Sequence, residues 1–547
     1  MRIGRQHFNS LAAVSFSSGA LSFFRPEPLF RSTYDAGMAF ASGATAPSGW
    51  IVASPSPQPA KNPWDIAHEH VRGLAPNSAV FTAMGDVYAE PDLLHPPLAV
   101  AESSSGPDKN YPPAPSAGFS PAWHLGPGFC NFPAAWKIGA TGKGVRIAHL
   151  DTGYWPEHVS TPRNILPEQG YNFYEDNTNV VDPGTTGILK NPGHGTATLA
   201  LLAGNDVSLD FNGQKYSGPI GGAPDASIVP VRIGASVVHL YTQPLAQGLD
   251  WACAPANFAP CHVVSLSHGG LPSTAWAAAV NRCYEAGVLV VAASGDSFYA
   301  VITSIASRFT VYPSAFNRVL TATGATFAKG PYKTSVPLEM QGCWGPASVM
   351  EKAAAAYTPN VPWMARGTKD GWDMNGAGTS ASTPQVAAAC ALWLQLYGGR
   401  FSVPWQRVQA CREALLNTLS MPGSNPNEIG RGILDASDFL DASMVDAIEK
   451  MVQQGKMNQA PADEVSFPFW RVIFGIGPPR SSVDQMYETE AAQLLSRSQN
   501  PAVLAPVLND PTGATVTPED GRKWRAAFLA EPDMSQYLRS RLAPLAQ

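Results

Sequence analysis

The chain has 547 residues, of which 36 are basic and 42 acidic, giving a formal net charge of −6. A hydrophobic content of 45% with 14% charged residues indicates a globular protein, long enough for more than one domain. There is no basic stripe or block, which argues against a nucleic-acid partner, and no apolar stretch reaches the roughly 18 residues that a membrane span needs.

The first part of the chain is rich in small residues and proline. Residues 1–60 therefore predict a poorly ordered leader. Arg2 and Arg5 precede an apolar stretch at 11–24, but serines dilute it and no clear cleavage site follows, so the signal-peptide pattern is weak. The compartment of the protein is left unassigned.

A compact segment and a linker follow the leader. Residues 61–100 predict a small α+β domain, with a helix over 63–71 and strands over 79–84 and 87–90. Residues 101–120 are rich in proline and serine, which predicts a flexible linker between this domain and the rest of the chain.

Three short motifs carry the parts of an activated nucleophile. The β-rich run 144–150 predicts a buried parallel strand that delivers Asp151 at its carboxyl end, where α/β sheets place their sites. His194 lies between two glycines at the start of a predicted helix. Ser380 directly precedes a long run of small and apolar residues, and at a helix N-terminus the backbone N–H groups favour negative charge. Alone, the serine motif also fits an ordinary helix cap. Together the three residues predict a serine nucleophile, a histidine base and a carboxylate that orients the histidine.

The motifs Asp151-Thr-Gly, His194-Gly-Thr and Gly-Thr-Ser380-Ala-Ser, in this order, resemble those of the subtilisin-like serine proteases. Further segments of the family pattern are matched at 221–232, 262–270, 312–324 and 430–436, so the resemblance covers roughly residues 121–440. It implies an α/β catalytic domain, a doubly wound parallel sheet with helices on both faces, and a serine endopeptidase that needs no metal or organic cofactor for its chemistry.

The same resemblance extends to the N-terminal domain. Glu90-Pro91-Asp92 resembles the end of a subtilisin-type pro-segment. This implies that residues 61–100 inhibit the enzyme and assist its folding until cleavage in the linker, whereas a plain accessory lobe is the alternative.

One position departs from the family pattern. Ser294-Gly295-Asp296 stands where the family usually carries Gly-Asn, whose amide donates a hydrogen bond to the oxyanion. Ionised Asp296 can only accept hydrogen bonds, but a protonated Asp296 could donate one; it resembles the oxyanion aspartate of the sedolisins. We therefore expect Asp296 to serve as oxyanion donor at acidic to neutral pH. The alternatives are that Asp296 points away, or that it has turned the chain into a peptide-binding pseudoprotease.

Two segments are expected to form the walls of a substrate cleft and to hold a peptide between them as an added strand. Their residues are Ser267, His268 and Gly269 on one side and Ala293, Ser294 and Gly295 on the other. His268 replaces a residue that is usually apolar, and we expect it either to contact an acidic group of the substrate or to face solvent. His149 and His158 are expected to be structural.

Other features predict less. The odd number of cysteines, 7, leaves at least one without an intramolecular partner, and Cys253 and Cys261 flank a loop that a disulfide could close. No cysteine spacing indicates zinc, and a structural calcium ion at the acidic loop 175–182 is less favoured than a solvated loop. Residues 441–547 predict a mainly helical extension that packs on the enzyme or mediates assembly. The residues do not distinguish hydrolysis from peptide-maturation transpeptidation.

Overall fold

The computed structural model describes residues 11–16, 27–28, 49–53, 61–74, 88–95, 107, 118–184, 191–237, 240–253, 255, 258–298, 308–333, 340–421, 426–467, 469–474, 481–498, 500–510 and 513–545. The expected strand at 79–84 and most of the linker at 101–120 lie outside these residues.

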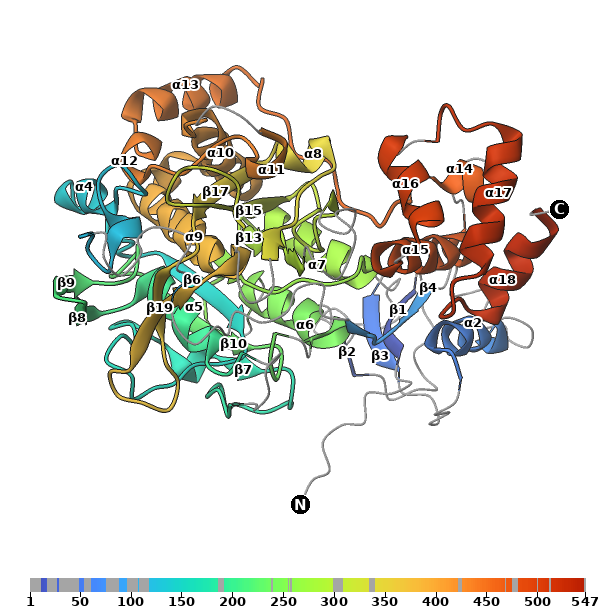
Figure 1. The fold of residues 1–547 in the computed structure, drawn as a ribbon, viewed down its shortest axis with the longest axis horizontal. Helices are drawn as coiled ribbons and strands as arrows, with labels where there is room; N and C mark the ends of the chain where they lie inside the picture. The colour runs from blue at the N-terminus through green and yellow to red at the C-terminus, as the bar shows by residue number, and fades with distance from the viewer. Residues whose placement is uncertain are drawn as a thin grey trace, which may run out of the picture.

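A seven-stranded parallel sheet forms the centre of the described chain (Figure 1). Its strands, in spatial order, are β17 (Ala353–Tyr357), β15 (Val319–Ala325), β13 (Leu289–Ala293), β12 (Val263–Leu266), β6 (Arg146–Asp151), β10 (Ser227–Arg232) and β7 (Tyr171–Asn172). Nearly every residue in the inner strands is buried, as expected for a parallel sheet that is covered on both faces. The predicted doubly wound α/β fold is therefore confirmed.

Alternation along the strands divides the core into two layers. On β6, Ile147 joins one hydrophobic cluster, whereas Ala148 and Leu150 join the other. The first cluster contains α5 (His194–Ala203), α9 (Gly378–Tyr397) and α10 (Pro404–Thr418), and the second contains α6 (Thr242–Cys253) and α7 (Thr274–Glu285). Because side chains alternate along a strand, Asp151 points to the same face as Ile147, toward α5.

Shorter elements surround the sheet. They are β8 (Asp206–Phe211) with β9 (Gln214–Pro219), β14 (Asp296–Phe298) with β16 (Met340–Gly342), β18 (Val361–Met364) with β19 (Trp372–Gly376), β5 (Leu94–His95) with β11 (Leu240–Tyr241), and helices α4 (Phe132–Lys137), α8 (Ala347–Met350), α11 (Pro426–Ile429), α12 (Ala436–Phe439) and α13 (Ala442–Gln453).

The N-terminal part forms a separate α+β unit. Helix α2 (Pro63–Leu74) and strand β4 (Tyr88–Pro91) agree with the predicted elements. Strands β1 (Leu11–Phe16), β2 (Glu27–Pro28) and β3 (Gly49–Ala53) join β4 in an antiparallel sheet of order β2-β3-β1-β4. Three short strands therefore lie within the segment that we expected to be a leader. Their partner strand lies tens of residues away, so local composition does not reveal the pairing.

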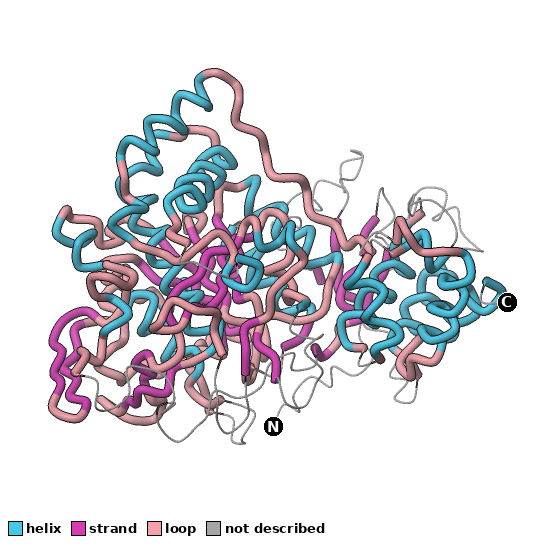
Figure 2. The backbone as a smooth tube through the Cα atoms, turned by 45° about the horizontal axis from the view of Figure 1, so that its top comes forward, coloured by secondary structure: helices cyan, strands magenta, loops and turns pink. Residues whose placement is uncertain are grey.

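The C-terminal part is helical, as predicted, and forms a lobe of its own. Helices α14 (Trp470–Phe474), α15 (Ser482–Arg497), α16 (Pro501–Asn509), α17 (Pro518–Leu529) and α18 (Gln536–Leu542) enclose their own hydrophobic cluster. Figure 1 shows α2 beneath this lobe, next to α18, and β4 next to α15, and Figure 2 shows the lobe as mainly helix. We expected the C-terminal extension to begin at residue 441, whereas Val445 and Ile448 of α13, which follow that residue, pack into the main core.

All seven cysteines are buried as free thiols, so the disulfide considered between Cys253 and Cys261 is not formed. Among the described helices, none combines the length and the apolar character that a membrane crossing requires.

Candidate active site

Asp151 lies at the carboxyl edge of the central sheet, as the last residue of β6. Its Oδ1 accepts a hydrogen bond from the Thr152 backbone N–H at 2.7 Å and lies 2.8 Å from Nδ1 of His194. Its Oδ2 accepts from the Thr198 hydroxyl at 3.0 Å. Both oxygens are engaged, so the orientation of this buried carboxylate is fixed.

The charge of Asp151 follows from its neighbours. Burial alone would raise the pKa of this carboxyl, but the nearby imidazoles of His194 and His268 hold its pKa below the ordinary value. An ionised carboxylate at this position favours the histidine tautomer whose proton is on Nδ1, so that Nε2 is unprotonated and can act as a base.

His194 is the first residue of α5, and the glycines on both sides allow this helix to begin against the Asp-Thr-Gly turn. Gly193 has a φ of +87°, in the left-handed region. A Cβ on Gly195 would lie 1.9 Å from the carbonyl oxygen of Gly153, so this close approach requires glycine. The imidazole of His194 is buried, with Trp363 at a ring-centroid distance of 5.7 Å.

Ser380 lies in the first turn of α9, as the serine motif predicts. Its hydroxyl donates to the backbone carbonyl of Ser267 at 3.3 Å, and the Ser267 hydroxyl donates to the Ser380 carbonyl at 3.0 Å. Helix α9 packs beside α5 and across β12, so the serine turn lies next to the elements that carry His194 and Ser267.

Asp296 lies beside the same turn. Its two oxygens accept hydrogen bonds from the Thr379 backbone N–H at 3.0 and 3.1 Å, and Oδ2 also accepts from the Thr379 hydroxyl at 3.2 Å. Burial raises the pKa of Asp296 to about 7, although the hydrogen bonds from Thr379 oppose the increase. Near neutral pH, this carboxyl therefore exists both as an acid that can donate and as a carboxylate that cannot.

The residues expected to form the cleft walls differ in whether their backbone groups are already hydrogen-bonded within the protein. Ser294 uses both of its backbone groups within the protein, because its N–H donates to Ala322 and its carbonyl accepts from Val311. Neither the N–H nor the carbonyl of Ser294 is therefore available to pair with a peptide strand. Gly269 is in close contact with Val311, since a Cβ there would lie 2.2 Å from that side chain. Ser267 contacts the serine turn directly.

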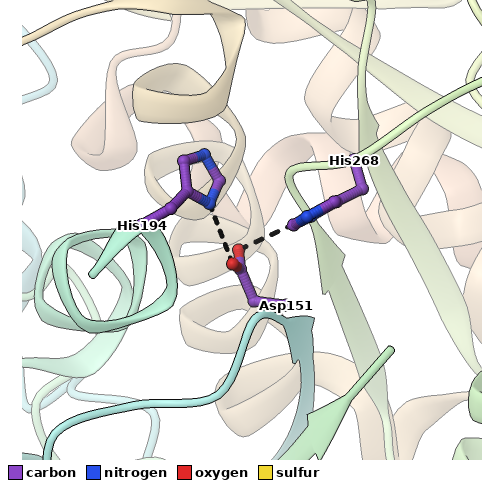
Figure 3. Close-up of side chains that lie close together, drawn as sticks. All are labelled: Asp151, His194 and His268. Atoms are coloured by element: carbon purple, nitrogen blue, oxygen red, sulfur yellow. Dashed lines mark hydrogen bonds and ion pairs between the residues drawn. The ribbon is translucent and has the colours of Figure 1, made fainter. Parts of the chain in front are cut away.

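His268 occupies neither of the two positions expected for it. Its side chain is buried, and its Nδ1 lies 3.8 Å from Oδ2 of Asp151, on the opposite side of the carboxylate from His194 (Figure 3). Its ring meets the His194 ring edge-on at a centroid distance of 5.3 Å. Strand β12 pairs with β6 so that Leu266 lies opposite Leu150, which brings the residues that follow β12 close to Asp151.

His149 and His158, which we expected to be structural, both form hydrogen bonds within the protein. His149 bonds to the Thr198 hydroxyl through Nε2 at 2.9 Å. His158 uses both ring nitrogens, on the Ser160 hydroxyl and on the carbonyl of Gly371.

The acidic loop also has partners within the protein. Glu175 pairs with Arg232, and Asp182 accepts hydrogen bonds from Thr152 and from the backbone N–H of Gly193.

Two residues of the site were not predicted from the sequence. Thr198 orients Asp151, and its position four residues after His194 on one helix face was an available signal. Thr379 holds Asp296 through its backbone N–H and its hydroxyl, and only the folded structure shows this contact.

Comparison with known proteins agrees with this geometry. Residues 142–437 match the model of the subtilase family, peptidase S8. The chain is 30% identical over 311 residues to subtilisin BL of Lederbergia lenta, a match that covers 56% of this chain and 93% of that protein. It is also 30% identical over 311 residues to an alkaline protease of Alkalihalobacillus alcalophilus, of which 66% is covered.

Among solved structures, the chain is similar to a protease of Pseudoalteromonas arctica PAMC 21717. The match has a TM-score of 0.45 and 24% identity, over 62% of this chain and all of that one.

Proposed function

Because the chain belongs to the subtilase family and is a serine-type endopeptidase, we propose that Ser380 is its nucleophile, His194 its general base and Asp151 the residue that orients the base. The observation that carries this assignment is the 2.8 Å contact between Asp151 and Nδ1 of His194, formed beside the helix whose first turn holds Ser380. The substrate is a peptide or protein.

The reaction proceeds in two stages. The Ser380 hydroxyl leaves the Ser267 carbonyl, gives its proton to Nε2 of His194 and attacks the peptide carbonyl carbon. The imidazolium, stabilised by Asp151, then protonates the leaving amine, and an acyl-enzyme remains on Ser380. In the second stage His194 takes a proton from water and the resulting hydroxide attacks the acyl carbon. The bond to Ser380 then breaks, His194 returns the proton to the Ser380 oxygen, and the new carboxyl terminus is released.

The negative oxygen that forms during attack needs donors. The Ser380 backbone N–H lies at the N-terminus of a 20-residue helix, where the helix dipole favours negative charge. Asp296 supplies the second donor when it is protonated, a state that its pKa of about 7 makes available in acidic and neutral solution. Loss of one such donor costs turnover about 10²–10³-fold.

Labelling with a fluorophosphonate tests the assignment, because this probe reacts only with an activated serine. The parent chain should be labelled, Ser380→Ala should not, and Ser382→Ala should retain labelling because that hydroxyl bonds to the Ala356 carbonyl. Labelling that persists in Ser380→Ala would refute the nucleophile. A processed protein that is not labelled at any pH would favour the pseudoprotease.

We further propose that the N-terminal α+β unit acts as a pro-segment. Glu90 accepts hydrogen bonds from the Ser273 hydroxyl and from the backbone N–H groups of Thr274 and Ala275, at the N-terminus of α7. Asp92 accepts from the backbone N–H of Gln243, in the first turn of α6. Two carboxylates thus cap two parallel helices of the catalytic domain, which supports specific docking of this segment on its own enzyme.

A further inference from the structure

His268 is a buried polar side chain that the proposed reaction does not use. Its side chain is 1% exposed, and within the described part of the chain neither ring nitrogen has a hydrogen-bond partner. A buried polar group without a partner costs about 1–3 kcal/mol, so its presence calls for an explanation. His149, by contrast, is satisfied by Thr198.

The surroundings of His268 form a set of metal-ligand atoms. One ligand atom from each of Asp151, His194 and His268 lies within 4.8 Å of the other two, and the described residues contain no other group of this kind. Figure 3 shows both imidazoles turned toward the carboxylate. The closest distances are 2.8 Å from Asp151 to His194 and 3.8 Å from Asp151 to His268.

The chemistry of the three groups selects the ion. Two imidazoles and one carboxylate, with an open fourth position, are the ligand set of many zinc sites, and imidazole is a poor ligand for the hard ions Mg²⁺ and Ca²⁺. A neutral imidazole offers one ring nitrogen as a ligand atom, and within the described residues neither nitrogen of His268 has a hydrogen-bond partner. The other ionisable group close to Asp151 is His149, whose Nε2 lies 3.8 Å from Oδ2.

We propose that Asp151, His194 and His268 form a binding site for a divalent transition-metal ion, with Zn²⁺ as the preferred ion, and that occupation of this site inhibits the protease. The inhibition rests on the proposed function, whereas the binding does not. Ligands of a tetrahedral zinc ion at about 2.0–2.1 Å lie about 3.3 Å apart, so binding would separate Asp151 and His194 slightly from their 2.8 Å contact and draw His268 closer.

The inhibition follows from the position of one proton. In the resting enzyme, neutral His194 carries its proton on Nδ1, facing Asp151. When the ion takes Nδ1, the proton moves to Nε2 of the same ring, and no proton is released. A ring protonated on Nε2 cannot accept the proton of Ser380, so attack stops until the ion leaves.

Equilibrium dialysis of the full-length Ser380→Ala chain against buffered Zn²⁺ tests binding without activity. We expect one ion per chain, and we expect Co²⁺ in its place to give the visible absorption bands of a four-coordinate site. When His268→Leu is combined with Ser380→Ala, the affinity for Zn²⁺ should fall about 100-fold or more, because one of three ligands is lost. Adding His158→Gln is the matched control, since both nitrogens of that ring are engaged elsewhere, and it should leave binding unchanged.

Inhibition is measured in parallel on the chain with Ser380 intact. Zn²⁺ should inhibit it reversibly, with recovery on adding EDTA, and His268→Leu should lose this sensitivity relative to its own metal-free rate. His268→Gln should also lose the sensitivity to Zn²⁺. A thermal unfolding curve that matches the parent curve would show that this variant has lost the ligand and not the fold. Equal Zn²⁺ affinity with and without His268, or no binding at millimolar Zn²⁺, would overturn the inference. Fluorophosphonate labelling without zinc binding would overturn it while leaving the proposed function intact.

Discussion

Both carboxylate oxygens of Asp296 face the backbone N–H of Thr379, the residue directly before Ser380, at 3.0 and 3.1 Å. A buried acid is thereby attached to the turn that presents the nucleophile. With one oxygen protonated, the other can still accept from Thr379, so the attachment is compatible with both protonation states.

The first prediction concerns the alkaline limb of the activity profile. Burial raises the pKa of Asp296 to about 7, so the donating form is present below pH 7 and disappears as the pH rises through that value. Turnover should fall over this range in the parent enzyme, and Asp296→Asn, which donates at every pH, should flatten the fall. kcat measured from pH 5 to pH 10 tests this.

A matched control for that experiment is Asp463→Asn. Burial also raises the pKa of Asp463, but its carboxylate accepts from the backbone of Asn317 and Arg318, away from the serine turn. In this variant kcat should still fall as the pH rises above 7. If kcat of Asp296→Asn depends on pH in the same way as kcat of the parent enzyme, Asp296 is not an oxyanion donor.

The second prediction concerns the orienting carboxylate. Asp151→Asn keeps the shape of the side chain but can favour the wrong tautomer of His194, so kcat should fall by about 10⁴-fold with little change in KM. Steady-state kinetics on a peptide substrate provide the measurement. If the rate falls less than tenfold, the contact between Asp151 and His194 does not serve catalysis.

The third prediction concerns docking of the N-terminal unit. Glu90→Ala leaves the Ser273 hydroxyl and two backbone N–H groups of α7 without their acceptor, which should lower the stability of the unprocessed chain by about 1–3 kcal/mol. The urea concentration at the midpoint of unfolding and the yield of active enzyme should both decrease.

Glu69→Ala is the control for Glu90→Ala. Glu69 belongs to the same N-terminal unit but forms a partly exposed ion pair with Lys61, which is worth about 0–1 kcal/mol. Equal losses in the two variants would argue against a specific cap.

The fourth prediction concerns the C-terminal lobe. The Gln493 amide accepts from the Trp64 indole N–H at 2.9 Å and donates to the Pro272 carbonyl at 2.8 Å, so one side chain joins the lobe to α2 and to the catalytic domain. Gln493→Ala should increase amide hydrogen exchange in α2. Gln485→Ala, on an exposed position of the same helix, should leave exchange unchanged. Unchanged exchange in both variants would show that the amide is not needed for the contact.

The sequence alone predicted the sheet, its two layers of helices and the order of the catalytic motifs. These features depend on local patterns, since β-rich runs form buried strands and a glycine directly before His194, or two residues before Ser380, lets a helix start there. The departure at Asp296 was also readable, because a carboxyl group replaces an amide at a defined place in a motif. Each of these signals lies within a few neighbouring residues.

The tertiary structure decided what depends on distant partners. Pairing of β12 with β6 brought the segment after β12 next to Asp151, where His268 is buried 3.8 Å from the carboxylate. Pairing of β1 with β4 made part of the expected leader a strand of the N-terminal sheet. Trp64 and Gln493, 429 residues apart, meet only because the lobe folds back on α2. Such contacts form where separately specified elements pack together, and no local pattern in the chain records which face meets which.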